Sequence, residues 1–103
     1  MKFLVHATMD VEAGNAAFLD GSIVTKIQKC LNDVKPEAVY FGIANGQRSM
    51  YLIVNVDSMD KLPEIAEPLW LDFKANIEVT PLMTPADLEK AGASFQRMAQ
   101  SRR

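Results

Sequence analysis

The 103-residue sequence predicts an α+β domain of the ferredoxin-like βαββαβ type, followed by an extra C-terminal helix. Three observations support this prediction. Apolar residues alternate in four short segments, they recur at helical spacing between those segments, and an Asn-Gly pair separates the second and third segments. In this topology the strands form one antiparallel sheet in the order 4-1-3-2, with the helices on one of its faces.

The first element is a strand over residues 2–8, in which Phe3, Val5 and Ala7 face one way. The next stretch, residues 12–33, has apolar residues about one helical turn apart. Gly14 and Gly21 weaken the beginning of this helix, because glycine disfavours helix interiors. Two alternatives therefore stay open. One is a single helix, and the other is an ordered loop followed by a helix that begins near Ser22 with Asp20 as its cap.

Asn45 and Gly46 predict a two-residue type I′ turn, because both central positions of that turn need positive φ. With the turn placed there, Tyr40 pairs with Tyr51 across the hairpin. The apolar side chains then share the opposite face: Val39, Phe41, Met50, Leu52 and Val54. A slip of one residue would mix the two faces, so the pattern supports this register.

A second helix is predicted in the segment DSMDKLPEIAEPLWLDF, with Pro63 near its start and Pro68 ending or kinking it. The segment KANIEVTPL is the predicted fourth strand, with Ala75, Ile77 and Val79 on the helix side. The last helix is predicted in TPADLEKAGASFQRMAQ. Thr84 is its expected N-cap and Pro85 its first residue, where a missing N–H costs nothing.

Composition limits the possible functions. A length of 103 residues, 49% of them hydrophobic, predicts a single domain over residues 1–103, and a net charge of −2 argues against a nucleic-acid partner. With one cysteine, Cys30, and one histidine, His6, we expect no internal disulfide and no metal site. The apolar start is too short to span a bilayer and lacks the features of a signal peptide. We therefore expect a soluble, cytoplasmic protein with no membrane partner.

The face of the sheet away from the helices is predicted to carry the functional residues. It mixes polar side chains with tyrosine, leucine and isoleucine, whereas a solvated face would carry more lysine and glutamate. The predicted set is Leu4, His6, Thr8, Tyr40, Tyr51, Ile53, Asn55, Asn76, Glu78 and Thr80. Two copies that stack these faces would form an α/β barrel, so we predict a homodimer or a higher homo-oligomer. The last helix is placed either swapped onto the partner or bracing it.

A centred register places Glu78 on the fourth strand directly beside His6 on the first. A carboxylate next to an imidazole favours the charged ring and holds one tautomer, so His6 and Glu78 are the candidate catalytic acid and base. The alternative is a structural pair that satisfies itself inside a dimer interface. The candidate substrate-binding residues are Tyr40, Tyr51 and Asn55 on the same face, and Arg48, which follows the turn and would meet an anionic ligand. The alternative for Arg48 is a solvated position or a rim ion pair.

Three segments resemble the muconolactone isomerase-like family and related small proteins of the dimeric α/β-barrel superfamily. They are MKFLVHATMDV for the first strand, NVDSMDKLPEIAEPLW for the third strand and second helix, and NIEVTPL for the fourth strand. The resemblance implies an oligomer with sites near subunit contacts and a double-bond shift by proton transfer, without a metal or an organic cofactor. His6 lies in the matching first-strand segment. Where the isomerases carry a tryptophan-arginine pair, this chain has Phe41 and Gly42.

Two functions are therefore open. The first is a cofactor-free, isomerase-like enzyme that moves protons on a small carboxylated or aromatic molecule. It predicts an enclosed, partly polar cavity beside His6. The second is a non-enzymatic module that binds a small ligand or a protein partner. It predicts that His6 and Glu78 satisfy each other.

Overall fold

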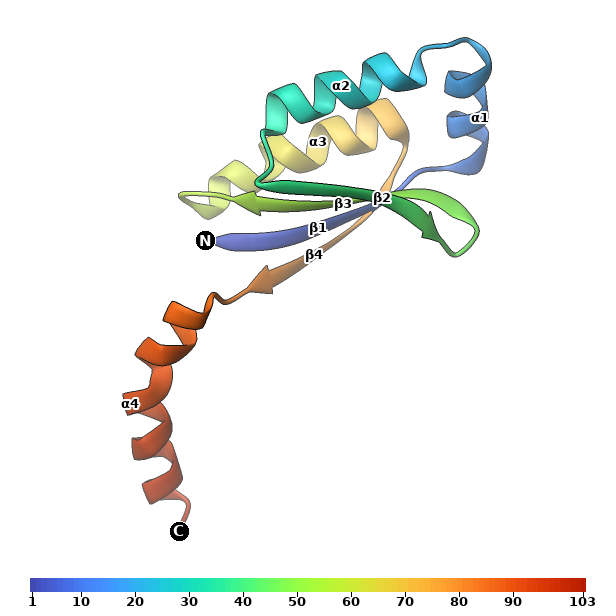
Figure 1. The fold of residues 1–103 in the computed structure, drawn as a ribbon. Helices are drawn as coiled ribbons and strands as arrows, with labels where there is room; N and C mark the ends of the chain where they lie inside the picture. The colour runs from blue at the N-terminus through green and yellow to red at the C-terminus, as the bar shows by residue number, and fades with distance from the viewer.

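The computed structural model describes residues 1–103 and contains one four-stranded sheet (Figure 1). In chain order the elements are β1 (Lys2–Thr8), α1 (Val11–Leu19), α2 (Ile23–Val34), β2 (Ala38–Ala44), β3 (Gln47–Asn55), the 3₁₀ turn η1 (Met59–Lys61), α3 (Leu62–Phe73), β4 (Asn76–Leu82) and α4 (Pro85–Ser101). The strands pair antiparallel in the order β2-β3-β1-β4, which confirms the predicted ferredoxin-like α+β topology. Helices α2 and α3 lie over one face, called here the covered face (Figure 1). The opposite face is called the open face.

The core lies between the covered face and the helices α2 and α3. Alternate residues of β1 are buried, as a strand with one face against helices requires. The most completely buried large side chains are Val5, Leu52, Val54 and Leu69. Full burial of a side chain of this size stabilises a fold by about 1.5–3 kcal/mol. The apolar alternation read from the sequence therefore corresponds to the main source of stability.

The β2–β3 hairpin has the predicted turn and register. Asn45 and Gly46 both have positive φ, 53° and 74°, and Tyr40 lies opposite Tyr51. The expected burial of Phe41 on the covered face is wrong, since this side chain is 57% exposed. Val79 is also exposed. Both residues belong to edge strands, β2 and β4, whereas the apolar covered-face side chains of the central strands β1 and β3 are buried.

The region before β2 forms two helices, so neither predicted alternative is fully correct. The second helix does begin just after Ser22, but the predicted loop before it is the helix α1. Asp10 caps α1 by accepting a hydrogen bond from the Ala13 backbone N–H at 2.9 Å. Gly21 has a φ of 80° and separates the helices. Asp20 accepts a hydrogen bond from the Ser22 N–H in this break.

Helix α3 continues through Pro68 to Phe73, so of the two predicted alternatives, an end or a kink at Pro68, the end is wrong. A proline inside a helix costs about 3 kcal/mol, because it removes one hydrogen bond and crowds the preceding turn. Three α3 side chains on the side facing the sheet are buried: Ile65, Leu69 and Phe73. Together their burial stabilises the helix by more than the proline costs.

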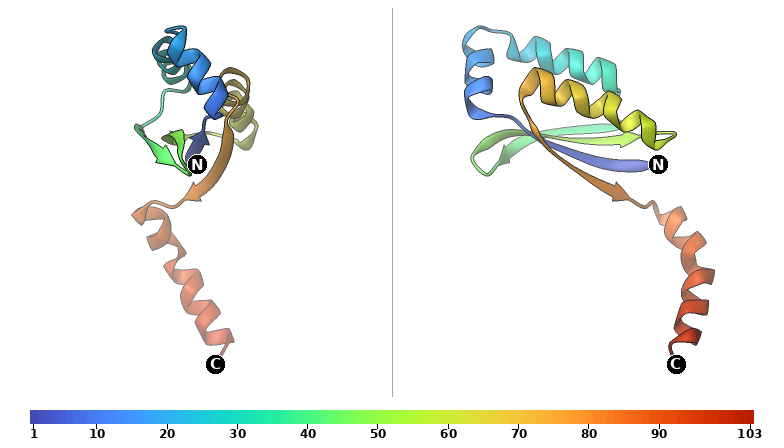
Figure 2. Two further views of the ribbon diagram at one scale, coloured as in Figure 1. Left: turned by 90° about the vertical axis from the view of Figure 1, so that its right-hand side faces the viewer. Right: turned by 180° about the vertical axis from the view of Figure 1, so that it is seen from behind.

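Helix α4 starts at the predicted residue and extends away from the rest of the molecule. Thr84 Oγ1 accepts a hydrogen bond from the Asp87 N–H at 3.1 Å, and the Asp87 carboxylate accepts one from the Thr84 N–H at 2.9 Å, which forms a capping box. No α4 residue is buried. The helix points away from α2 and α3, on the side of the open face (Figure 2). None of the helices combines the length and apolar character needed to cross a membrane.

Candidate functional site

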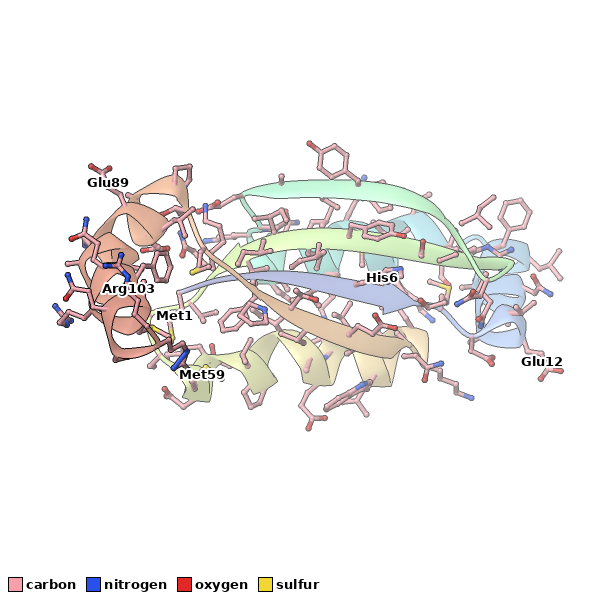
Figure 3. The ribbon with its side chains drawn as sticks, turned by 90° about the horizontal axis from the view of Figure 1, so that it is seen from below. Met1, His6, Glu12, Met59, Glu89 and Arg103 are labelled. Atoms are coloured by element: carbon pink, nitrogen blue, oxygen red, sulfur yellow. The ribbon has the colours of Figure 1, made fainter.

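A row of four side chains crosses the open face from edge to edge. Tyr40 on β2 lies opposite Tyr51 on β3, Tyr51 lies opposite His6 on β1, and His6 lies opposite Glu78 on β4. The rings of His6 and Tyr51 stack with their centroids 4.2 Å apart and their planes 7° from parallel. Figure 3 looks onto this face and shows His6 near its middle. The strand pairing thus assembles four of the predicted site residues on one surface.

His6 and Glu78 are neighbours in the sheet but do not form an ion pair. The two ion pairs of the chain are elsewhere, and no hydrogen bond joins the imidazole to the Glu78 carboxylate. Nε2 of His6 is buried and has no hydrogen-bond partner. Glu78 itself is exposed. In the single chain the pair is therefore placed side by side without being mutually satisfied.

Asn55 belongs to a different cluster, at the far end of β3. Its amide donates a hydrogen bond to Oε1 of Glu37 at 2.6 Å, and Lys2 Nζ lies 2.6 Å from Oε2 of the same carboxylate. The hydrogen bond from Lys2 is the main reason why the pKa of Glu37 is lowered, and the bond from Asn55 lowers it further. Sequence reasoning did not identify Glu37. Its place just before β2, beside the paired end of β1 and β3, explains why it reaches both groups.

Arg48 lies on the covered face and contacts α1. Its Nη2 donates a hydrogen bond to Oδ1 of Asn15 at 3.1 Å. The guanidinium lies so close to Gly14 that a Cβ added there would be 2.5 Å from Nη1 and 2.9 Å from Sδ of Met9. No carboxylate pairs with Arg48. The structure therefore separates Arg48 from the other predicted site residues and holds it, half-buried, without a counter-ion.

A cavity of about 310 Å³ lies between the covered face and the helices, next to Arg48. Nine of its twelve lining residues are hydrophobic. The lining comprises Ala7, Met9, Ile23, Ile27, Phe41, Gly42, Arg48, Ser49, Met50, Leu69, Phe73 and Ala75. Arg48 is the one charged residue among them. The cavity is thus an apolar space with a cation in its wall, the usual composition of a small-molecule site.

Small residues create this space, and sequence reasoning missed it. Ala7 on β1 and Ala75 just before β4 lie on the covered face, where most neighbouring positions carry larger side chains. Gly42 on β2 also lines the cavity. A cavity could have been predicted from these small residues, because they lie at one end of an apolar face whose other residues are large.

Cys30 and the acidic residues do not form a second reactive centre. Cys30 is buried in the core, and its pKa is raised by this burial and, to a lesser extent, by the charges of Asp33 and Asp72. A thiol with a raised pKa is a weak nucleophile at neutral pH. No group of three or more His, Cys, Asp or Glu side chains is placed to hold a metal ion.

Residues 1–96 match the family described as "Domain of unknown function (DUF3303)". The chain belongs to the DUF3303 family. The match includes the whole sheet, the cavity and the larger part of α4, so all the features described above lie within this DUF3303 domain. No curated protein matches the chain.

Proposed function

We propose that this DUF3303 protein binds a small, mainly apolar molecule with a carboxylate group in the cavity beside Arg48. The observation that supports this proposal is the half-buried Arg48 guanidinium, which has no acidic partner and lines an apolar cavity. A cytoplasmic setting, where a free thiol such as Cys30 stays reduced, is part of the proposal.

The charge of Arg48 favours an anionic ligand. A partly desolvated cation is costly unless something compensates its charge, and Asn15 Oδ1, which accepts the hydrogen bond from Arg48, is neutral. A carboxylate can accept two parallel hydrogen bonds from one guanidinium, which makes such a pair strong and directional. Nη2 of Arg48 already donates a hydrogen bond to Asn15, so a ligand would approach the remaining N–H donors of the guanidinium.

The size and lining of the cavity favour a compact apolar body. A volume of about 310 Å³ is at the small end of ligand pockets, which leaves room for one aromatic ring or a short branched chain. Phe41 and Phe73 in the wall suit an aromatic ligand, because ring pairs gain energy beyond their area of contact.

The test compares phenylacetate, as a probe, with its neutral amide. We expect phenylacetate to bind the wild-type chain and phenylacetamide to bind more weakly, because only the carboxylate pairs with Arg48. Arg48→Gln should weaken binding of phenylacetate by about 10- to 100-fold, the equivalent of one lost charge-assisted hydrogen bond. Isothermal titration calorimetry or ligand-observed NMR would measure both values.

Arg97→Gln is the matched control. Arg97 is exposed on α4, far along the chain from the cavity, and removal of its charge should leave phenylacetate binding unchanged. If Arg48→Gln and Arg97→Gln have the same effect, or if the amide binds as well as the acid, the proposal fails.

A second candidate function is proton-transfer catalysis on the open face. The specific observation in its favour is His6, whose Nε2 is buried without a partner between Tyr51 and Glu78. In this proposal His6 and Glu78 move protons, while Tyr40 and Tyr51 position a small carboxylated or aromatic substrate. The resemblance of three segments to the muconolactone isomerase-like family suggests a lactone with a mobile double bond. The proposal includes a second subunit that encloses this site, because the cavity beside Arg48 lies on the other face.

His6→Gln tests this second candidate. The variant keeps a polar side chain but cannot act as an acid or base, so any isomerisation of muconolactone by the wild-type protein should fall by about 10²- to 10⁴-fold. A spectrophotometric assay of the double-bond shift would measure kcat. Equal rates for His6→Gln and the wild type, or no turnover by either, would count against catalysis.

A further inference from the structure

Met9 and Arg48 lie side by side in the wall of the cavity. The Met9 N–H donates a hydrogen bond to the Arg48 carbonyl at 2.8 Å, which extends the pairing of β1 with β3 by one residue. A Cβ built at Gly14 would lie 2.9 Å from Sδ of Met9 and 2.5 Å from Nη1 of Arg48. The thioether sulfur and the guanidinium are therefore close neighbours, and both residues line the cavity.

The Met9 sulfur leaves the guanidinium of Arg48 free to bind a ligand, because a thioether is only a weak hydrogen-bond acceptor. Nη2 of Arg48 donates a hydrogen bond to Oδ1 of Asn15, whereas Nη1, the nitrogen nearest to Gly14, donates none. In the proposed function, Nη1 is thus one of the donors that receive the ligand carboxylate. A stronger acceptor at the position of the sulfur would compete for the same N–H groups.

Met9 is also the methionine of the cavity that has contact with solvent. Part of its surface is exposed, whereas Met50 in the same wall is only 7% exposed and belongs to the core. An oxidant in solution therefore reaches Met9 more easily than Met50. The remaining four methionines lie outside the cavity lining: Met1, Met59, Met83 and Met98.

Oxidation would turn the Met9 side chain from an apolar neighbour of Arg48 into a polar one. In the reaction with hydrogen peroxide, the sulfur takes one oxygen: an S–O bond forms, the O–O bond breaks, and the other oxygen leaves as water. The sulfur loses two electrons and the peroxide gains them. The product is methionine sulfoxide, a polar side chain whose oxygen accepts hydrogen bonds.

We propose that a peroxide inactivates the Arg48 site by oxidising Met9, whose sulfoxide oxygen then accepts the hydrogen bond from Nη1 that the ligand carboxylate would take. This inference concerns regulation of the cavity and rests on the proposed function. The polar S–O group also makes the wall less suited to an apolar ligand, so both effects lower the affinity. A thiol-dependent methionine sulfoxide reductase would restore the thioether and with it the site.

The test measures phenylacetate binding by the full chain before and after treatment with hydrogen peroxide. Peptide mass spectrometry would give the fraction of sulfoxide at each methionine, and calorimetry would give the dissociation constants. We expect oxidation of Met9 to weaken binding by at least about tenfold, which corresponds to the loss of one charge-assisted hydrogen bond. Treatment with the reductase should restore the original affinity.

Met9→Leu and Met59→Leu separate the effect of Met9 from that of the other methionines. Leucine keeps an apolar side chain of similar volume but has no sulfur to oxidise. For each variant we compare the dissociation constants after and before peroxide. Their ratio should stay near one for Met9→Leu and should equal that of the wild type for Met59→Leu, because Met59 is 56% exposed and lies outside the cavity.

Two outcomes of this comparison would overturn the proposal. One is that peroxide weakens binding to Met9→Leu as much as binding to the wild type, which would place the effect at another methionine. The other is that Met9 stays unoxidised when Met59 is fully converted to the sulfoxide, which would show that peroxide does not reach the Met9 sulfur.

NMR of the Arg48 guanidinium tests the same contact without a ligand. The Nε–H signal of Arg48, assigned by its loss in Arg48→Gln, should shift on oxidation of the wild type and stay in place in peroxide-treated Met9→Leu. An unchanged signal in the oxidised wild type would overturn the inference, even if phenylacetate binds. A shifted signal in a chain that never binds phenylacetate would support the contact between Met9 sulfoxide and Arg48, and would contradict the proposed ligand alone.

Discussion

On the covered face of the sheet Val5 and Leu52 are almost completely buried, whereas their neighbours on the open face, Leu4 and Ile53, keep part of their surface in contact with solvent. The two faces have the same pleat and the same strands. Only the covered face completes its burial within one chain, because α2 and α3 lie over it. The covered face therefore provides the main stability of the single chain, while the side chains of the open face stay partly in contact with solvent.

The two faces also differ in their chemistry. The covered face combines an apolar cavity with one unpaired cation, Arg48. The open face carries titratable groups, His6 and Glu78, and two tyrosines in a row. The proposed ligand site and the row from Tyr40 to Glu78 therefore lie on opposite sides of one sheet, and substitutions on one side should leave the other largely unaffected.

The largest expected effect comes from adjacent residues on β3 that point to opposite faces. Leu52→Ala should lower the free energy of unfolding by about 2–5 kcal/mol, because it leaves a cavity in a fully buried position. Ile53→Ala should cost less than about 1.5 kcal/mol in the monomer, because Ile53 already contacts solvent. Urea unfolding at low protein concentration would measure both.

Repeating the measurement at high protein concentration sharpens the comparison. If the open face is buried in a dimer, the cost of Ile53→Ala should grow with concentration, while that of Leu52→Ala stays constant. Equal costs for the two substitutions at low concentration would mean that the faces do not differ in the way described.

Most of the fold could be predicted from the sequence, because the sequence patterns that indicate its strands, turn and helix start are local. Period-two alternation placed all four strands, and Asn45-Gly46 set the register of the hairpin from which the Tyr40–Tyr51 pair follows. Thr84 as the N-cap of α4 could also be predicted, since a threonine followed by a proline is a local signal for the start of a helix.

The parts that sequence reasoning missed depend on contacts between distant residues. Gly14 made the start of α1 look like a loop, but Arg48 from β3 approaches this position closely and its guanidinium lies where a side chain would be. The cavity depends on the space that Ala7 and Ala75 leave under α2 and α3. Neither relation is visible in local periodicity.

Gly14→Ala should separate stability from ligand binding on the covered face. The added Cβ would displace the end of Arg48, which is flexible, and alanine favours a helix over glycine by about 0.5–1 kcal/mol. We therefore expect stability within about 1 kcal/mol of the wild type, but roughly tenfold weaker phenylacetate binding, because the guanidinium no longer faces the cavity in the same way. Thermal unfolding and calorimetry would measure the two effects.

Gly92→Ala is the control for this substitution. Gly92 lies inside α4, where a Cβ would meet nothing within 4 Å. Gly92→Ala should stabilise its helix through the same preference of alanine over glycine, and it should leave phenylacetate binding unchanged. Equal binding by Gly14→Ala and the wild type would show that the position of Arg48 does not matter to the ligand.

The smallest expected effect concerns Glu37, which joins β1 to β3 at the end of the open face through Lys2 and Asn55. Its pKa is lowered from 4.5 in the folded chain, so the ionised carboxylate stabilises the fold at pH values above about 4.5. This contribution is lost as the pH falls through the lowered folded-state value. The difference in free energy of unfolding between the wild type and Glu37→Gln should therefore be constant near neutral pH and shrink below pH 4.5. Because Glu37 is exposed, the difference should be small. A difference that persists unchanged in acid would assign the effect to the shape of the side chain and not to its charge.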